Sequence, residues 1–189
     1  MTSAVAHAQT RTINESYFPL HVESRWTYRC TTKGEDPFTK TVTLGTEPTI
    51  RNGLSYLSVT TQIGDNKNLA SMYYYADSKG IVWVAPTKSP DKAMAVAAQS
   101  PKPGEKIEDM SVAAAPEIME IPALGTQEVM RLENFSLDDS EITDERRTEW
   151  RARYYARGVG LVAESDGLGN SCELTKYRIG AFTIPPKTF

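Results

Sequence analysis

A strictly alternating run between residues 147 and 157 constrains the fold of this chain more than any other feature. The alternating positions are Thr148, Trp150, Ala152, Tyr154 and Ala156 on one side and Arg147, Glu149, Arg151, Arg153, Tyr155 and Arg157 on the other. A period of two residues is typical of a β-strand with one buried and one solvated face. We therefore predict a strand in which Trp150 and Tyr154 are buried and Arg151 and Arg153 are accessible to solvent.

Nine further segments are rich in β-branched and aromatic residues and are bounded by turn signals. They are residues 26–32, 39–45, 54–63, 68–76, 80–85, 117–121, 126–135, 160–164 and 171–179. Asn52-Gly53 and the turns at 77–80 and 166–170 supply the glycine, asparagine and aspartate that tight hairpins need. The sequence thus predicts an all-β fold, an antiparallel meander of about ten strands that forms a curved sheet, a half-barrel or an open barrel.

The segment 86–116 differs from its surroundings because it is rich in proline and alanine. Only residues 91–99 have the composition of a short helix. Sequence features on its two sides resemble each other: Tyr73-Tyr74-Tyr75-Ala76 precedes a glycine-led strand, as Tyr154-Tyr155-Ala156 does later. This indicates two degenerate half-repeats, about 17–85 and 101–180, joined by the Pro/Ala-rich segment.

Length and charge limit the classes of protein to consider. The chain has 189 residues and a formal net charge of −3, which predicts one globular domain over residues 9–189. The basic run 146–157 is interleaved with acidic and aromatic residues, which argues against a nucleic-acid partner. No stretch approaches the roughly 20 apolar residues of a transmembrane helix.

Residues 1–8 have two interpretations. Ala6 and Ala8 occupy small-residue positions before a plausible cleavage at Gln9, as in the end of a secretory signal peptide. The alternative is a disordered, alanine-rich amino terminus. The first interpretation is favoured and predicts a periplasmic or secreted protein.

The chain has two cysteines, Cys30 and Cys172, near its opposite ends. In an oxidising compartment they are a candidate disulfide, which would bring the two ends of the sheet together. The alternative is two buried free thiols.

Two motifs carry a family resemblance. The opening Tyr17-Phe18-Pro19-Leu20-His21-Val22-Glu23-Ser24-Arg25-Trp26-Thr27-Tyr28 and the later Tyr154-Tyr155-Ala156-Arg157-Gly158-Val159-Gly160-Leu161-Val162 resemble a group of uncharacterised bacterial exported, lipoprotein-like β-domains. Glu23 stands where these domains are expected to have glycine, and the turn at 122–127 carries an inserted leucine. The resemblance implies a fold and no particular chemistry.

The residues that usually carry chemistry are sparse. His21 is the sole imidazole beyond the predicted signal remnant, and we interpret it as a partly exposed structural residue. One histidine and two distant cysteines are not a metal-ligand set, and the glycines form no phosphate loop, so we predict no metal and no cofactor. A catalytic carboxylate pair stays open, because such pairs are defined by distance in the fold.

Aromatic residues are the most suggestive feature for function. We predict that Tyr74, Trp83, Trp150 and Tyr154 line a ligand site, the alternative being ordinary core packing. The favoured hypothesis is a non-catalytic binding or carrier module of the cell envelope for a hydrophobic or lipid-like ligand. The second is a structural or interaction module that docks an envelope protein, and an unrecognised enzyme is the third.

Overall fold

The computed structural model describes residues 16–51, 54–88, 92–134 and 150–180, and their strands form one antiparallel sheet. The first meander comprises β1 (Arg25–Thr31), β2 (Phe38–Arg51), β3 (Leu54–Ile63), β4 (Asn66–Ala76), β5 (Ile81–Pro86) and β6 (Met94–Ala98). The second comprises β7 (Lys106–Ile107), β8 (Met110–Val112), β9 (Glu117–Ile121), β10 (Gly125–Asn134), β11 (Ala152–Ala156), β12 (Gly160–Ser165) and β13 (Ser171–Arg178).

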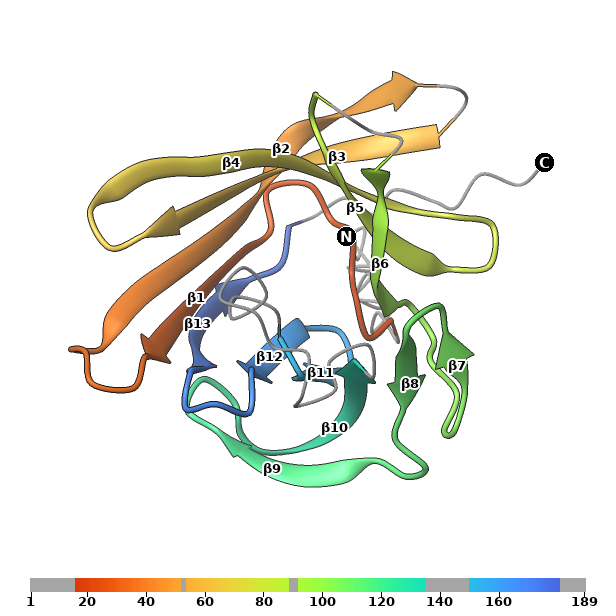
Figure 1. Cartoon of the computed structure of the whole chain (residues 1–189). Helices are drawn as coiled ribbons and strands as arrows, with labels where there is room; N and C mark the ends of the chain where they lie inside the picture. Colours follow the sequence, from red (N-terminus) through yellow and green to blue (C-terminus); the bar gives the residue numbers. More distant parts are fainter. Residues whose placement is uncertain (1–15, 52–53, 89–91, 135–149, 181–189) are drawn as a thin grey trace, which may run out of the picture.

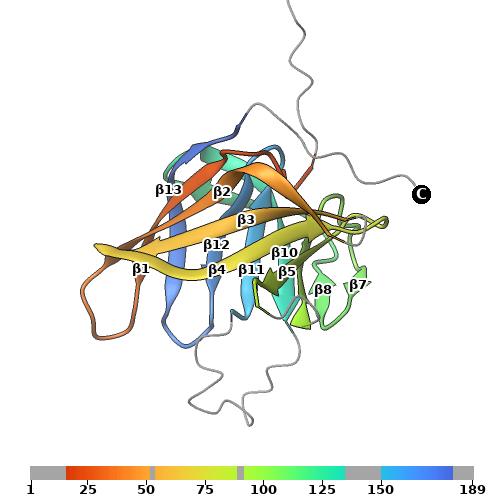
Figure 2. The same ribbon diagram turned by 90° about the horizontal axis from the view of Figure 1, so that it is seen from above.

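The sheet curls into a nearly closed barrel (Figure 1). The strand order is β6-β5-β4-β3-β2-β1-β13-β12-β11-β10-β8-β7, with β9 paired to β10. The two meanders meet where β1 pairs with β13, and in the described part of the chain no ladder joins β6 to β7. Figure 2 shows β2, β3 and β4 running across the wall formed by β10 to β13. The predicted all-β, barrel-like antiparallel fold is confirmed; the descent of its halves from a duplication stays a prediction.

Most predicted strands are present, and one element is wrong. Residues 91–99 were predicted as a short helix, but Met94–Ala98 forms β6, which pairs with β5. Val96, Ala97 and Ala98 are buried there. The small alanine side chains allow close packing against the barrel interior, and this tertiary contact outweighs the helix propensity of alanine. The short strands β7 and β8 also lie in the segment predicted to be a linker.

The face assignment of the alternating run is right for Arg151 and wrong for Arg153. Arg151 is exposed as predicted, but the Arg153 side chain is only 19% exposed. Trp150 and Tyr154 are half-buried, whereas Tyr155 is almost fully buried. β11 therefore turns Arg153 and Tyr155 toward the barrel interior, where Arg153 meets a carboxylate. Residues 147–149, like residues 1–8, lie outside the described residues.

The opening motif packs into the barrel as a nine-residue segment, 16–24, before β1. Its residues Tyr17, Phe18 and Leu20 are buried. The Tyr17 N–H donates to the Gln99 carbonyl just after β6 (2.8 Å), and the Gly158 N–H donates to the Ser16 carbonyl (2.9 Å). The segment thus connects the end of β6 with the β11–β12 turn.

The two motifs that carry the resemblance contact each other. The Trp26 indole N–H donates to the Val159 carbonyl at 2.6 Å, and the Tyr28 hydroxyl donates to the Leu161 carbonyl at 3.0 Å. These bonds join β1 to the start of β12. The motifs therefore specify how the two meanders pack together, which explains why they indicate a fold and no chemistry.

The backbone conformation of Glu23 explains why glycine is expected at this position. It is one of two described non-glycine residues with positive φ, at 59°. An L-amino acid with a Cβ atom is disfavoured in this left-handed region, whereas glycine is not.

We expect Glu23→Gly to raise the free energy of unfolding by about 0.5–1 kcal/mol, because the relief of backbone strain outweighs the extra entropy of glycine in the unfolded chain. Urea unfolding of the wild type and the variant measures this. Glu35→Gly is the control, since Glu35 is also exposed but is not among the residues with positive φ. A Glu23→Gly protein no more stable than the control would contradict the explanation.

The candidate disulfide is present. Cys30 and Cys172 are direct partners in the β1–β13 ladder, and their Sγ atoms are bonded across a sequence separation of 142 residues. The bond therefore fixes the contact that unites the two meanders.

We expect replacement of both cysteines by alanine to lower the free energy of unfolding by about 2–5 kcal/mol, because the unfolded chain regains the entropy of a very long loop. Denaturant unfolding measures the loss. Thiol titration of denatured, unreduced wild-type protein should detect no free thiol, and two titratable thiols would refute the bond.

Candidate functional site

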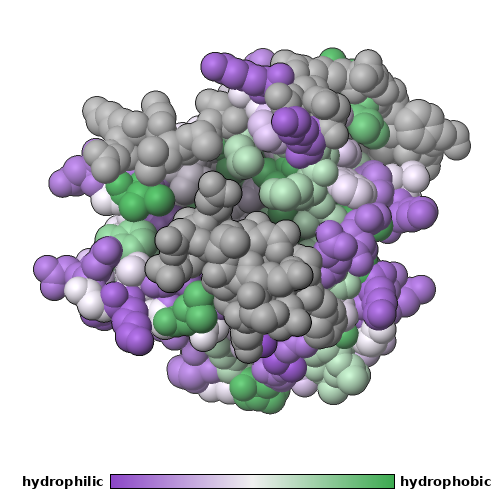
Figure 3. Space-filling model, in the orientation of Figure 1, coloured by the Kyte–Doolittle hydropathy of each residue, from purple (hydrophilic) through white to green (hydrophobic). Residues whose placement is uncertain are grey.

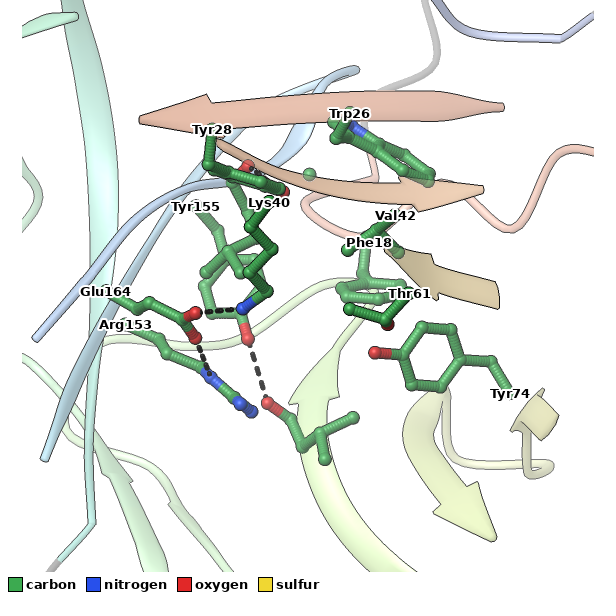
Figure 4. A pocket seen from close by; sticks show the side chains of 13 residues that line it. Phe18, Trp26, Tyr28, Lys40, Val42, Thr61, Tyr74, Arg153, Tyr155 and Glu164 are labelled. Carbon is green, nitrogen blue, oxygen red and sulfur yellow. Dashed lines mark hydrogen bonds and ion pairs between the residues drawn. The ribbon is translucent and has the colours of Figure 1, made fainter. Parts of the chain in front are cut away.

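A small cavity of about 90 Å³ lies inside the barrel. Its wall is aromatic and apolar on one side and charged on the other (Figure 4). The lining residues are Phe18, Trp26, Tyr28, Lys40, Val42, Thr61, Tyr74, Val96, Arg153, Tyr155, Gly160, Leu161 and Glu164. We refer to this space as the inner chamber.

The charged side of the inner chamber is an ion-pair triad of Lys40, Glu164 and Arg153. Arg153 on β11 and Glu164 on β12 are direct cross-strand partners, and Arg153 Nε lies 3.2 Å from Glu164 Oε2. The Lys40 ammonium on β2 bonds to the other carboxylate oxygen, Glu164 Oε1. Glu164 therefore links a strand of the first meander to the second (Figure 4).

The environment of Glu164 keeps its carboxylate ionised. Its side chain is only 13% exposed, and burial alone would raise its pKa. The opposing charges of Arg153 and Lys40, together with their hydrogen bonds, outweigh burial and lower the pKa to about 2. The triad thus carries two positive charges and one negative charge at neutral pH.

Three tyrosines surround the triad with neutral hydroxyl groups. Burial is the main cause that raises the pKa values of Tyr28, Tyr74 and Tyr155, so these phenols stay protonated. The Tyr155 hydroxyl donates to the Val96 carbonyl at 2.9 Å, which ties β11 to β6 across the interior. Phe18 lies between Tyr74 and Tyr155, with ring centroids 5.3 Å and 5.9 Å apart.

A second, larger cavity of about 630 Å³ opens to solvent next to the inner chamber. We call it the mouth. Its lining residues are Cys30, Thr31, Thr32, Phe38, Lys40, Thr61, Ile63, Trp150, Arg153, Glu164, Ser165, Asp166, Asn170, Ser171 and Cys172. Four of them, Lys40, Thr61, Arg153 and Glu164, also line the inner chamber. The triad therefore forms the boundary between the two spaces.

Two of the predicted ligand residues border these cavities. Tyr74 lines the inner chamber, and Trp150 lines the mouth, where the Arg153 guanidinium lies 4.2 Å from the centre of its ring. Trp83 and Tyr154 line neither cavity. The Trp83 indole donates to Asp77 Oδ2 at 3.1 Å, and its ring stacks on Tyr75. The four residues thus do not surround one common space, and binding by any of them stays a prediction.

Sequence reasoning missed the triad. A readable signal existed, because a hairpin folded about Gly158 and Val159 places Arg153 opposite Glu164, as observed. The predicted partly exposed histidine is instead buried: His21 is 9% exposed, and its Nδ1 lies 2.9 Å from the Gly180 carbonyl oxygen. It borders neither cavity, and its structural role stays a prediction.

Within residues 16–51, 54–88, 92–134 and 150–180, no group of three His, Cys, Asp or Glu side chains could hold a metal ion. The same residues include no helix with the length and apolar character needed to cross a membrane.

No protein-family model and no curated protein matches the sequence. Among solved structures, the barrel is similar to a protein of Bacteroides fragilis described as exported and as having a YmcC-like fold, with a TM-score of 0.53, 13% identity and coverage of 87% of this chain and 99% of that one. A protein of Parabacteroides distasonis described as a lipoprotein gives a TM-score of 0.48 and 11% identity at the same coverage. The first similarity confirms the predicted resemblance at the level of the fold.

The low pKa of Glu164 predicts a loss of stability in acid. Because its folded-state pKa lies below its unfolded value of about 4.5, the stabilisation is complete above that pH and is lost as pH falls toward 2. The loss attributable to this carboxylate is on the order of 3 kcal/mol. Urea unfolding at about pH 6 and pH 2 should show it as a difference between wild type and Glu164→Gln.

Glu128→Gln is the control, since Glu128 is an exposed strand carboxylate on β10. We expect the control to retain the acid sensitivity of the wild type. Glu164→Gln should also be less stable near neutral pH, because it leaves two buried cations without their counter-ion. Equal acid sensitivity of Glu164→Gln and wild type would contradict the ionised triad.

Proposed function

We propose that this protein is a non-catalytic binding module of the cell envelope for a small apolar or lipid-like molecule. The observation that carries the proposal is the open mouth leading to an aromatic inner chamber within a nearly closed barrel. A cavity that binds a small molecule usually has roughly 300–1,000 Å³, a range that the mouth alone reaches with about 630 Å³. Phe38, Ile63 and Trp150 supply its apolar surface.

Binding agrees better with the lining residues than catalysis does. The inner chamber is lined by phenols, an indole, apolar side chains and a carboxylate paired with Lys40 and Arg153, and neither a thiol nor an imidazole is among its lining residues. Glu164 is held ionised by two cations, so it is a poor proton donor or acceptor near neutral pH.

An envelope location is supported by three observations. The amino-terminal residues have the pattern of a signal-peptide end. The Cys30–Cys172 disulfide is typical of oxidising compartments. The Bacteroides fragilis protein of similar fold is described as exported. Periplasmic and secreted locations both fit these observations.

The proposal predicts that a bulky side chain at Thr61 blocks binding, because Thr61 lines both the mouth and the inner chamber. We expect Thr61→Phe to weaken the affinity for the neutral fluorescent probe Nile red by at least about tenfold, measured by titration. Thr60→Phe is the matched control, since Thr60 is exposed and lines neither cavity. Unfolding curves should show that both variants are folded.

Native mass spectrometry of the protein purified from its own host would identify a retained ligand. A wild-type protein that carries no small molecule and does not bind Nile red would reject the proposal. Equal binding by Thr61→Phe and Thr60→Phe would place any binding outside the barrel.

An interaction module is the second candidate, favoured by an aromatic cluster on β3, β4 and β5 in which Tyr56 is buried and Tyr73, Tyr75 and Trp83 are half-buried. The Tyr56 ring lies 5.9 Å from Tyr73 and 4.7 Å from Tyr75, which stacks on Trp83. In the view of Figure 3, most of the coloured surface is hydrophilic, with smaller hydrophobic areas between. A partner bound at the aromatic cluster would be insensitive to Thr61→Phe and sensitive to Trp83→Ala.

A further inference from the structure

The triad places an excess of positive charge at the boundary between the inner chamber and the mouth. Lys40 and Arg153 are 22% and 19% exposed at their side chains, and Glu164 is their shared carboxylate. The three tyrosines around them are neutral. Among the described residues of the interior, the single carboxylate of Glu164 therefore balances only one of the two cations. A partly buried cation without an opposite charge lowers the stability of the fold, because it has lost part of its hydration.

Aromatic rings compensate part of this charge. The Lys40 ammonium lies 5.7 Å from the centre of the Tyr28 ring, and Arg153 stacks on Trp150 at 4.2 Å. A ring face attracts a cation but carries no net charge, and the Tyr155 side chain, which forms a hydrogen bond with Arg153, is neutral. A bound anion would supply the missing negative charge.

The shape of Arg153 suits a planar anion. Its Nε is used by Glu164 Oε2, and the end of the guanidinium extends beyond the carboxylate toward the Tyr155 hydroxyl, in the lining of the inner chamber (Figure 4). The planar fork of a guanidinium matches the two oxygens of a carboxylate. The Tyr74 hydroxyl points into the same space and can donate to one of these oxygens (Figure 4).

The sizes of the two cavities fix the orientation of such a ligand. The inner chamber, about 90 Å³, has room for a head group but not for a long chain. The mouth is several times larger and carries the apolar side chains Phe38, Ile63 and Trp150. A head group at the triad therefore leaves an apolar tail in the mouth.

We propose that the ligand is an amphipathic molecule with a carboxylate head group, which Arg153 and Lys40 bind at the boundary between the inner chamber and the mouth. This inference rests on the proposed binding function and names the chemistry of its ligand.

Asp166 is the other charged residue lining the mouth, and its Oδ1 accepts hydrogen bonds from the backbone N–H groups of Leu168 (2.7 Å) and Asn170 (3.0 Å). Its carboxylate is thus held within its own turn.

The experiment compares the binding of four probes to the intact protein. The probes share a twelve-carbon alkyl chain and differ in their head group: dodecanoate, dodecanol, dodecyl phosphate and dodecyltrimethylammonium. Affinities are measured at neutral pH by titration calorimetry and by the fluorescence of the protein's tryptophans. We expect the wild type to bind dodecanoate at least about tenfold more tightly than dodecanol, with the cationic probe weakest.

Arg153→Met tests the residue that carries the preference. It leaves Lys40 and Glu164 as a neutral pair, so the ratio of dodecanoate to dodecanol affinity should fall to about one. Arg151→Met is the control, since Arg151 is exposed and lines neither cavity, and it should keep the wild-type ratio. If Arg153→Met does not fold, Glu164→Gln gives the opposite test, because an added net positive charge should raise the ratio.

The outcomes separate the two proposals. If none of the four probes binds, the proposed binding function fails and the head-group inference fails with it. If dodecanol binds as tightly as dodecanoate, or if Arg153→Met keeps the wild-type ratio, the head-group inference alone is overturned. Tighter binding of dodecyl phosphate than of dodecanoate would also overturn the carboxylate assignment, in favour of a phosphate.

Discussion

Strands β1 and β13 form the contact that turns two separate meanders into one barrel. Their pairing sets which residues of the neighbouring strands face each other across the interior. Cys30 pairs with Cys172, which in turn pairs with Glu164 on β12, while Tyr28 pairs with Lys40 on β2. The Lys40–Glu164 ion pair therefore spans the β1–β13 contact from its two sides. Changing that register by one residue would turn Lys40 or Glu164 to the outside of the barrel.

The strands that sequence predicted best are those whose local pattern and turns agree with their tertiary environment. Residues 54–63 and 117–121 were predicted with the observed bounds, since both are rich in β-branched or aromatic residues and are flanked by glycine or proline. Met94–Ala98 was missed because alanine favours a helix locally, whereas pairing with the preceding strand β5 makes it a strand. This pairing leaves no periodic pattern in an alanine-rich segment.

The candidate site was predicted only in part, and Arg153 shows why. Alternation separates the two faces of a strand but does not say which of them points inward when both carry aromatic residues, as β11 does. The interaction that decides the question comes from Lys40 and Glu164, which are 124 residues apart. Tyr74 and Trp150 were named from aromatic enrichment and do border the cavities, whereas Trp83 follows the same pattern and lines neither.

The contacts that close the barrel join residues far apart in the sequence, and this affects how the chain folds. Trp26 and Tyr28 bond to carbonyls 133 residues away, and the paired cysteines are 142 residues apart. A topology with such high contact order folds slowly, because the entropy of closing a long loop must be lost before the contacts form. The first meander can form early, but its β1 edge has no partner until β13 docks on it. A free edge of this kind can pair with other chains, so a partly folded chain in which β1 has formed and β13 has not yet docked is prone to aggregation.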